Sequence, residues 1–291
     1  MAKHYIPNRS RERSAMTQSA AIITRTGAIQ IEIPSAETPL MKGIQWGAVD
    51  AFPSPAYWQY QVVARRLAGR PPSYKLGRTL TEEVGACLLG GHGIPAAVGI
   101  AAYEKLRKLG AFAGTPPSAG QIETWLREPL QVGTRWVRFR FAAQRARYLA
   151  AALPLVRSAP VFVQGRSLRD CLLKLPGIGP KTASWVARNW LDADDVAILD
   201  IHITRVCRAI GLFPRGLTVE RHYFQLEEQF LQFSAALNVR PSELDAVIWY
   251  EMASSTKMAR FVMEQLDEKH LAPFSRRKKS ERLDSPITLS G

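Results

Sequence analysis

Apolar residues recur at helical spacing through most of the chain. The exception is residues 22–33, where apolar and polar positions alternate around Gly27 and predict a short strand or hairpin. From Pro55 onward, roughly nine or ten amphipathic segments are separated by Gly, Pro and Ser, and no repeat of solenoid period is present. We therefore predict a mainly α fold with two helical lobes and a small N-terminal β element.

Residues at the starts of these segments favour helix initiation. Proline suits the first helical turn because its missing N–H is not needed there, and a Ser or Thr oxygen can cap the free amides. The predicted initiating or capping residues are Pro55, Thr79 or Thr81, Pro95, Ser118 and Ser167.

The net charge of the chain indicates a class of binding partner. Hydrophobic residues make up 46% of the chain and charged residues 22%, as in an ordinary globular protein. The 39 Lys and Arg exceed the 25 Asp and Glu by a formal net charge of +14. Such an excess favours a polyanionic partner, first nucleic acid and second an anionic membrane surface.

The excess divides into three regions. Residues 1–20 and 271–291 are polar and each have a net charge of +3, and we predict that both are disordered tails. The remaining +8 belongs to residues 21–270, which we expect to form the folded core. The partner is therefore expected to contact the core as well as the tails.

Composition also excludes several classes of protein. Charges interrupt every apolar stretch before the roughly 20 residues that a membrane helix needs, and no apolar segment of a secretory signal follows the basic start. The three cysteines are too few for a disulfide framework, a four-cysteine zinc site or a four-cysteine iron–sulfur cluster. We expect a cytoplasmic protein without a metal site formed by side chains.

The densest basic cluster of the core spans residues 134–148, where five arginines alternate with four aromatic residues. Arginine beside aromatic side chains suits contacts to phosphates and bases. The alternative is one amphipathic helix with a solvated arginine face. Under the first hypothesis the candidate DNA contacts are Arg135, Arg138, Arg140 and Arg145.

A second candidate for phosphate binding is the segment LPGIGPK, residues 175–181. It separates two helical patterns, so residues 166–191 are predicted to form a helix–hairpin–helix. Gly177 and Gly179 let the backbone turn tightly and approach another molecule closely. Free amides at the start of the second helix would bind a DNA phosphate without selecting a base sequence. The alternative is a structural turn between packed helices.

Two residues in this region suggest chemistry. Lys181 begins the second helix, where the helix dipole opposes a positive charge and so favours the neutral, nucleophilic amine. Asp200 follows nineteen residues later, directly after four apolar residues, and we expect it to cap the next helix. A capped carboxylate is held in place, and an anion near a neutral amine can stabilise positive charge that develops on a sugar.

The segment LPGIGPK, with Asp200 in an apolar-Asp-x-His-x-x-Arg-Val setting, resembles the helix–hairpin–helix DNA glycosylase superfamily. It looks closest to the 8-oxoguanine DNA glycosylases, in particular the archaeal branch. The similarity covers about residues 80–260, and residues 245–250 resemble the last core helix of that branch. It implies a two-lobed glycosylase architecture.

The resemblance also implies roles for individual residues. Lys181 would attack C1′ of the damaged nucleotide and form a Schiff base, and Asp200 would stabilise the oxocarbenium-like sugar. Amides of Gly177 and Gly179 would bind phosphate. A lysine at this position implies base excision followed by β-elimination, on a base flipped out of double-stranded DNA. Hairpin carbonyls would bind a structural monovalent cation, and no iron–sulfur cluster is expected.

Three further residues are candidates for a base pocket. His92 lies in a glycine-rich loop that could line the pocket or could be a turn with an exposed histidine. Trp249 and Tyr250 could stack on a flipped base or could pack in the core.

These observations predict a monomeric DNA glycosylase, and by resemblance an AP lyase, that acts on 8-oxoguanine in base excision repair. One alternative is excision of a hypermodified phage base, such as glucosylated hydroxymethylcytosine, in antiviral defence. A second is a non-catalytic helix–hairpin–helix module that binds DNA. A protein of the membrane surface is a third, and it would depend on the basic tails. In a bacterium or archaeon, the glycosylase would act at the nucleoid.

Overall fold

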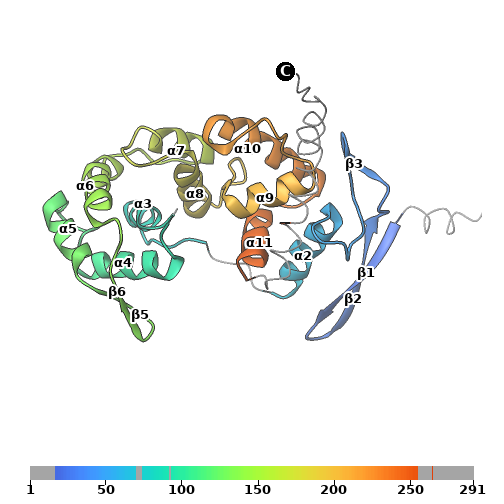
Figure 1. Cartoon of the computed structure of the whole chain (residues 1–291), viewed down its shortest axis with the longest axis horizontal. Coiled ribbons are helices and arrows are strands. Elements are labelled where there is room, and N and C mark those ends of the chain that lie inside the picture. Colours follow the sequence, from blue (N-terminus) through green and yellow to red (C-terminus); the bar gives the residue numbers. More distant parts are fainter. Residues whose placement is uncertain (1–16, 70–73, 92, 255–263, 265–291) are drawn as a thin grey trace, which may run out of the picture.

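The computed structural model describes residues 17–69, 74–91, 93–254 and 264. Within these residues it contains ten α-helices and three two-stranded sheets, which confirms the mainly α prediction (Figure 1). No helix in this part of the chain combines the length and the apolar composition that crossing a bilayer requires.

The first sheets lie before the first helix. Strand β1 (Thr17–Thr24) pairs antiparallel with β2 (Gly27–Pro34), and the predicted hairpin is confirmed. Strands β3 (Pro39–Met41) and β4 (Ile44–Gln45) form a second, short pair. Because β1 begins at Thr17, the last four residues of the predicted N-terminal tail belong to a strand. Residues 1–16 and 271–291, which include the rest of both predicted tails, lie outside the described residues.

The helices follow in chain order, with the bounds α2 (Pro55–Leu67), α3 (Leu80–Leu89), α4 (Ala96–Lys108), α5 (Ala119–Arg127), α6 (Ala142–Arg157), α7 (Gly165–Leu172), α8 (Pro180–Leu191), α9 (Ile201–Ala209), α10 (Val219–Ala236) and α11 (Pro241–Ser254).

Most predicted helix starts are confirmed. The Thr79 hydroxyl accepts from the Glu82 amide at 3.2 Å, so Thr79 and not Thr81 caps α3. The Ser118 hydroxyl accepts from the Gln121 amide at 3.2 Å and caps α5. The prediction for Ser167 is wrong, because α7 begins two residues before it.

The arginine-rich segment 134–148 differs from the single helix of the alternative interpretation. Strands β5 (Leu130–Val132) and β6 (Arg135–Val137) form a hairpin, and a loop leads from β6 into α6. Gly133 allows the turn because its φ is +58°. The prediction that strands occur only near the N-terminus is therefore wrong.

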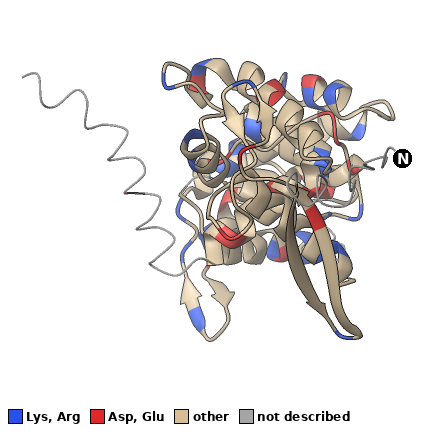
Figure 2. Cartoon of the chain, turned by 90° about the vertical axis from the view of Figure 1, so that its right-hand side faces the viewer, with Lys and Arg blue, Asp and Glu red and all other residues tan. Residues whose placement is uncertain are grey.

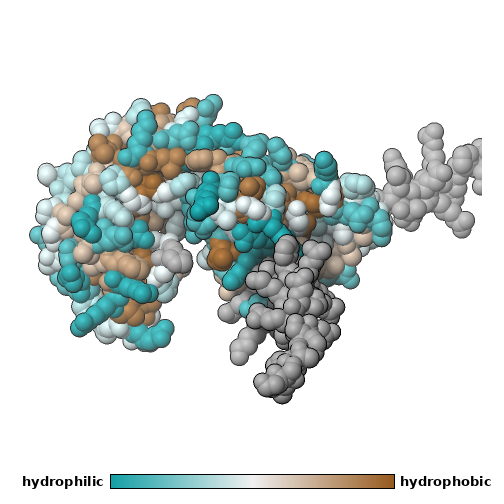
Figure 3. Space-filling view, turned by 45° about the horizontal axis from the view of Figure 1, so that its top comes forward, coloured by the Kyte–Doolittle hydropathy of each residue, from teal (hydrophilic) through white to brown (hydrophobic). Residues whose placement is uncertain are grey.

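Two hydrophobic cores divide the molecule into two lobes. Lobe 1 contains α3–α8 and the β5–β6 hairpin, and lobe 2 contains the N-terminal strands, α2 and α9–α11 (Figure 1). The chain thus begins in lobe 2, builds lobe 1 and returns. It passes between the cores at Val196 and Ala197, just before Asp200. Figure 3 shows the surface hollowed between the lobes.

Charged side chains are distributed unevenly over these lobes. Figure 2 shows many Lys and Arg positions along the helices, whereas the β1–β2 hairpin has few charged positions. Its charged residues are Arg25 in the turn and Glu32 on β2. The basic surface that could bind a polyanion therefore lies on the helices and not on the β1–β2 hairpin.

Candidate active site and DNA interface

The hairpin between α7 and α8 requires glycine at one position. Its turn is closed by a hydrogen bond from the Ile178 amide to the Leu175 carbonyl at 3.2 Å. Gly177 has a φ of +79°, and a Cβ there would lie 2.2 Å from Cδ2 of Tyr148 on α6. Both the backbone conformation and the available space exclude a side chain at Gly177.

The outer side of the same hairpin presents free donors. The backbone amides of Gly177, Gly179, Lys181 and Thr182 donate to no residue within the described ranges. Gly179 has an ordinary φ of −93°, and a Cβ on it would meet nothing within 4 Å. Its lack of a side chain therefore leaves the surface open, and the clustered donors suit an anion.

The hairpin carbonyls fit the monovalent cation that the resemblance implies. The carbonyl oxygens of Pro176, Gly177 and Ile178 accept no hydrogen bond from the residues that the structure describes. Oxygen ligands of this kind suit a hard cation. The cation stays a prediction.

Lys181 is the second residue of α8, as predicted. Its side chain is partly buried and forms no ion pair or hydrogen bond with any residue of the described ranges. Pro180 precedes it at the first helical position, where the hydrogen bonds within the helix do not need a backbone N–H. The amine is therefore available to a ligand bound at the hairpin.

Asp200 caps α9, and this prediction is confirmed. Its Oδ1 accepts from the amides of His202 and Ile203 at 2.8 and 2.9 Å. Both capping bonds end on one oxygen, and no residue in the described part of the chain bonds to Oδ2, which leaves it available for a ligand. Its side chain is partly buried.

Lys181 and Asp200 belong to different lobes, on α8 and at the start of α9, and both elements are drawn near the centre of the molecule in Figure 1. A buried carboxylate connects their elements. Glu227 on α10 accepts from the Ser184 hydroxyl, one turn after Lys181, at 3.1 Å. It also accepts from the Ala197 amide, three residues before Asp200, at 2.9 Å.

A second buried pair crosses the junction of the lobes. Arg188 on α8 donates to Asp245 on α11 at 2.8 Å, and its guanidinium lies 4.0 Å from the centre of the Tyr74 ring. Burial raises the pKa of Asp245 to about 7, Arg188 opposes that rise, and the charge of Asp200 adds to it. Asp245 lies on α11, which packs against α9, the helix that Asp200 caps.

The aromatic residues of α11 are not core residues, so the packing alternative is wrong for both. Trp249 is 45% exposed and Tyr250 50% exposed. Trp249 lies one turn after Asp245, on the side of α11 that faces the junction. Tyr250 instead stacks under the guanidinium of Arg65, 4.0 Å from its ring centre. His92 lies outside the described residues.

The candidate arginines occupy different environments. Arg135 is exposed on β6, and Arg138 and Arg140 lie in the loop that follows it. Arg145 is directed inward and donates to the Gly90 carbonyl at 3.4 Å, and burial lowers its pKa. We therefore assign Arg145 to bracing the loop after α3.

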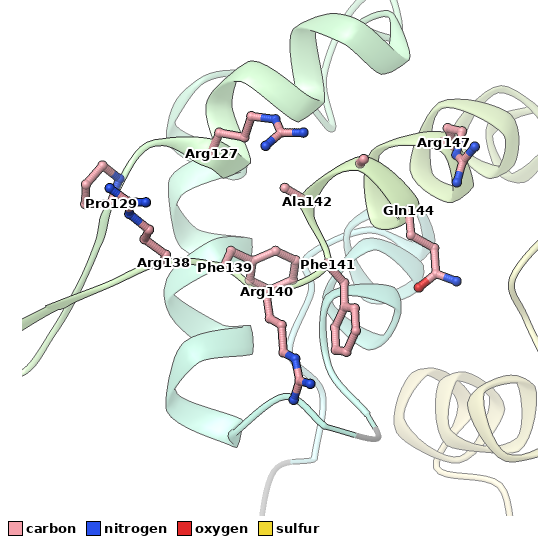
Figure 4. A pocket seen from close by; sticks show the side chains of 10 residues that line it. Arg127, Pro129, Arg138, Phe139, Arg140, Phe141, Ala142, Gln144 and Arg147 are labelled. Carbon is pink, nitrogen blue, oxygen red and sulfur yellow. The ribbon is translucent and has the colours of Figure 1, made fainter.

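Arg138 and Arg140 line a hollow of about 620 Å³ at the start of α6 (Figure 4). Its lining adds Arg147 of α6, which sequence reasoning left out of the candidate contacts although it belongs to the same cluster. Within the described residues, Arg138, Arg140 and Arg147 have no carboxylate partner, whereas Arg127 pairs with Glu123. The hollow and the hairpin are linked by Tyr148, whose ring contacts Gly177 and whose hydroxyl accepts from Gln144 at 3.1 Å.

Glu227 and Tyr223 were also missed. A signal was present in the sequence, because Glu227 interrupts the apolar stripe of α10 that includes Leu226 and Phe230. A carboxylate on a buried stripe needs partners, but the sequence does not identify them.

The cysteines show no sign of a shared site. Cys87 lies in the core of lobe 1 and Cys207 in that of lobe 2, and burial raises the pKa of both thiols. Across the described ranges, no group of three or more His, Cys, Asp and Glu side chains is placed to hold a metal ion.

Comparison with known families gives a match to this region. The profile of the family described as Ogg-HhH, 8-oxoguanine DNA glycosylase, matches residues 75–239. An 8-oxoguanine DNA glycosylase/AP lyase of Methanocaldococcus jannaschii is 33% identical over 131 residues, which cover 43% of this chain and 62% of that protein. A protein of the same description from Metallosphaera sedula is 35% identical over 82 residues, 28% of this chain and 40% of the relative. The matched segments thus span less than two thirds of either relative.

Solved structures include similar chains. The 8-oxoguanine DNA glycosylase of Thermotoga maritima is 28% identical, with a TM-score of 0.47 over 59% of this chain and 78% of that one. The M. jannaschii glycosylase/lyase, crystallised with a 15mer DNA containing 8-oxoguanine, is 28% identical, with a TM-score of 0.46 over 59% of this chain and 79% of the other.

Proposed function

The chain belongs to the 8-oxoguanine DNA glycosylase family, and from that premise we propose that it excises 8-oxoguanine from double-stranded DNA and then nicks the strand as an AP lyase. The observation that supports this most is the placement of Lys181 and Asp200. One begins the helix after a phosphate-binding hairpin, and the other caps the next helix at the junction of the lobes. Such an enzyme would act on chromosomal DNA in the cytoplasm.

Lys181 is the nucleophile of the proposed reaction. Its neutral amine attacks C1′ of the flipped nucleotide, and the bond from C1′ to the base breaks as the new C–N bond forms. The base leaves with the bonding electron pair and takes up a proton, while the attacking nitrogen loses one. Opening of the sugar ring gives a Schiff base.

β-Elimination then nicks the strand. A proton leaves C2′, a C2′–C3′ double bond forms, and the C3′–O bond breaks so that the 3′ phosphate leaves with the bonding electron pair. Water then hydrolyses the Schiff base and releases Lys181 from the sugar. Asp200 stabilises the positive charge that develops on the sugar during the first step. The free Oδ2 of its carboxylate suits this role, because the cap occupies Oδ1 alone.

The hairpin and the arginine hollow account for binding of the DNA backbone. Amides of Gly177 and Gly179 bind a phosphate beside Lys181. The strand then passes over Tyr148 to Arg138, Arg140 and Arg147, whose charges have no carboxylate partner in the described structure. Arg135, exposed on the neighbouring strand, extends this track. Contacts of this kind fix the position of the duplex without selecting its sequence.

Trp249 is the better of the two candidates for stacking on the flipped base. It is exposed on the side of α11 that carries Asp245, close to the junction where Asp200 lies. Tyr250 is already stacked under Arg65.

Borohydride trapping on a duplex with one 8-oxoguanine tests the proposal. Wild-type protein and Lys174→Gln, a control at an exposed lysine of the same hairpin, should form a covalent adduct. Lys181→Gln should form none, yet should bind the duplex with wild-type affinity. A panel with other lesions and glucosylated hydroxymethylcytosine identifies the base. Absence of adduct and of abasic product on every duplex would refute the glycosylase and leave a DNA-binding module.

A further inference from the structure

We propose that Glu227 is a positioning residue that sets the distance between Lys181 and Asp200 across the junction of the two lobes. The proposal rests on the function assigned above. Glu227 touches no reacting atom, since it is 3% exposed on α10. It acts through the elements that hold the two catalytic side chains.

The first connection is to the helix of Lys181. Ser184 lies three residues after Lys181 on α8, so the two positions share a face of the helix. The fully buried Ser184 hydroxyl donates to Oε1 of Glu227 at 3.1 Å. The other carboxylate oxygen accepts from Arg169 of α7, the first helix of the helix–hairpin–helix. Glu227 therefore contacts both helices that flank the hairpin.

The second connection is to the extended segment that ends at Asp200. The Ala197 amide donates to Oε1 of Glu227 at 2.9 Å. One turn earlier on α10, the buried Tyr223 hydroxyl donates to the Ala197 carbonyl at 2.7 Å and accepts from the Leu199 amide at 3.2 Å. These bonds hold residues 197–199 against α10, and Asp200 is the next residue of the chain.

These contacts link the two lobes at one oxygen atom. Oε1 of Glu227 accepts from α8, whose apolar side chains belong to the core of lobe 1, and from Ala197, which belongs to the core of lobe 2. A small rotation of one lobe against the other would break one of these bonds in a buried place, where an unpaired polar group is costly. A displacement of about 1 Å between reacting groups can lower a rate about 100-fold.

Two mild substitutions test the connections while they leave the Arg169–Glu227 pair intact. Ser184→Ala removes the link to α8, and Tyr223→Phe removes the hydroxyl that holds residues 197–199. Glu227→Gln tests the carboxylate itself. Ser234→Ala is the matched control, because among the described residues this buried hydroxyl on α10 bonds only to the Phe230 carbonyl of its own helix, at 3.0 Å.

The decisive comparison is between two single-turnover rates. Excision of 8-oxoguanine needs both Lys181 and Asp200, whereas Schiff-base trapping on a preformed abasic site needs Lys181 alone. We expect Ser184→Ala and Tyr223→Phe to slow excision at least tenfold and trapping less than threefold, with unchanged affinity for DNA. The Ser234→Ala control should retain both rates. Equal losses of both rates, or no loss of excision, would overturn the proposal.

Amide hydrogen exchange over residues 196–203 gives a readout independent of activity. Exchange in this segment should be faster in Tyr223→Phe and Glu227→Gln than in the wild type or Ser234→Ala. If wild-type protein excises no base, the proposed function fails, and exchange still decides whether α10 holds the Asp200 segment. Unchanged exchange in both variants would contradict that role.

Discussion

Two glycines of one hairpin have different reasons to be glycine. Gly177 has a positive φ and the ring of Tyr148 against it, whereas Gly179 has an ordinary conformation and open space around it. The first is required by the fold, and the second by whatever approaches the hairpin from outside. Substitution of each glycine by alanine separates the two requirements.

We expect Gly177→Ala to lower the free energy of unfolding by about 2–4 kcal/mol, from backbone strain and the collision with Tyr148. Gly179→Ala should lower it by only about 0.5–1 kcal/mol, because Gly179 is the N-cap of α8 and Ala caps a helix less well than Gly. It should also weaken binding of duplex DNA, because the new methyl group lies over the phosphate-binding amides. Thermal unfolding and a DNA titration measure the two effects, and a Gly179→Ala protein as unstable as Gly177→Ala would contradict the assignment.

Asp200 combines a cap with a proposed catalytic charge, and substitution can separate them. Asn caps a helix about as well as Asp, so Asp200→Asn should unfold within about 0.5 kcal/mol of the wild type. Its loss of charge should slow excision by about 10²–10³-fold. Asp200→Ala should lose a further ~1 kcal/mol of stability, because both capping bonds disappear. Melting curves and single-turnover assays on the same preparations decide, and full activity of Asp200→Asn would exclude the electrostatic role.

At the scale of elements, α6 and the loop before it bring Arg138, Arg140 and Arg147 to one hollow of lobe 1. Replacing Arg140 or Arg147 with Gln should weaken binding to every DNA sequence alike. If each residue neutralises one phosphate, each substitution should reduce the slope of log affinity against log salt by about 0.9. The matched control is Arg25→Gln at the tip of the β1–β2 hairpin, where the slope should not change.

Arg145 tests the boundary of this surface. Because it is half-buried and donates to the Gly90 carbonyl, Arg145→Gln should lower the melting temperature and leave the salt slope unaltered. A reduced slope would return Arg145 to the DNA interface.

The element scale also shows which features sequence reasoning can find. Caps such as Thr79 and Asp200 were predictable because their partners lie two or three residues away. The β5–β6 hairpin was not, since its arginines and aromatic residues fit a helical period equally well and Gly133 alone marked the turn. Glu227 was also out of reach, because its partners Ser184 and Ala197 are 43 and 30 residues distant.

At the scale of the whole molecule, the junction of the lobes determines which residues of α11 are exposed and which are buried. Trp249 and Tyr250 are large aromatic residues of the kind that usually pack in a core. They are exposed because α11 packs against α2 and α9 through other residues. Asp245 is buried at the same junction with Arg188. The division into lobes was foreseeable from the family resemblance, whereas the groups that meet between them depend on the full fold.

Asp245 should make stability depend on pH. Its pKa is raised from 3.8 to about 7, so between these values the folded protein holds a proton that the unfolded chain has released. The free energy of unfolding should therefore fall as pH rises from about 4 to about 7, and should level off above that range. Asp245→Asn removes this titration. Between pH 5 and pH 8 the melting temperatures of the wild type and of Asp245→Asn should converge or cross. If the two melting temperatures stay a constant interval apart at every pH, the assignment is contradicted.

The route of the chain has a consequence for biosynthesis. Lobe 2 is assembled from the beginning and the end of the described chain, with all of lobe 1 between them. A ribosome that has completed α2 must add about 130 residues before α9 emerges, which takes roughly 7–27 s at 5–20 residues per second. During that interval Trp46 and Trp58 lack the cover of α9, α10 and α11, although lobe 1 can already fold. The nascent chain therefore passes through a half-built state with its tryptophans exposed, in which a holding chaperone would act.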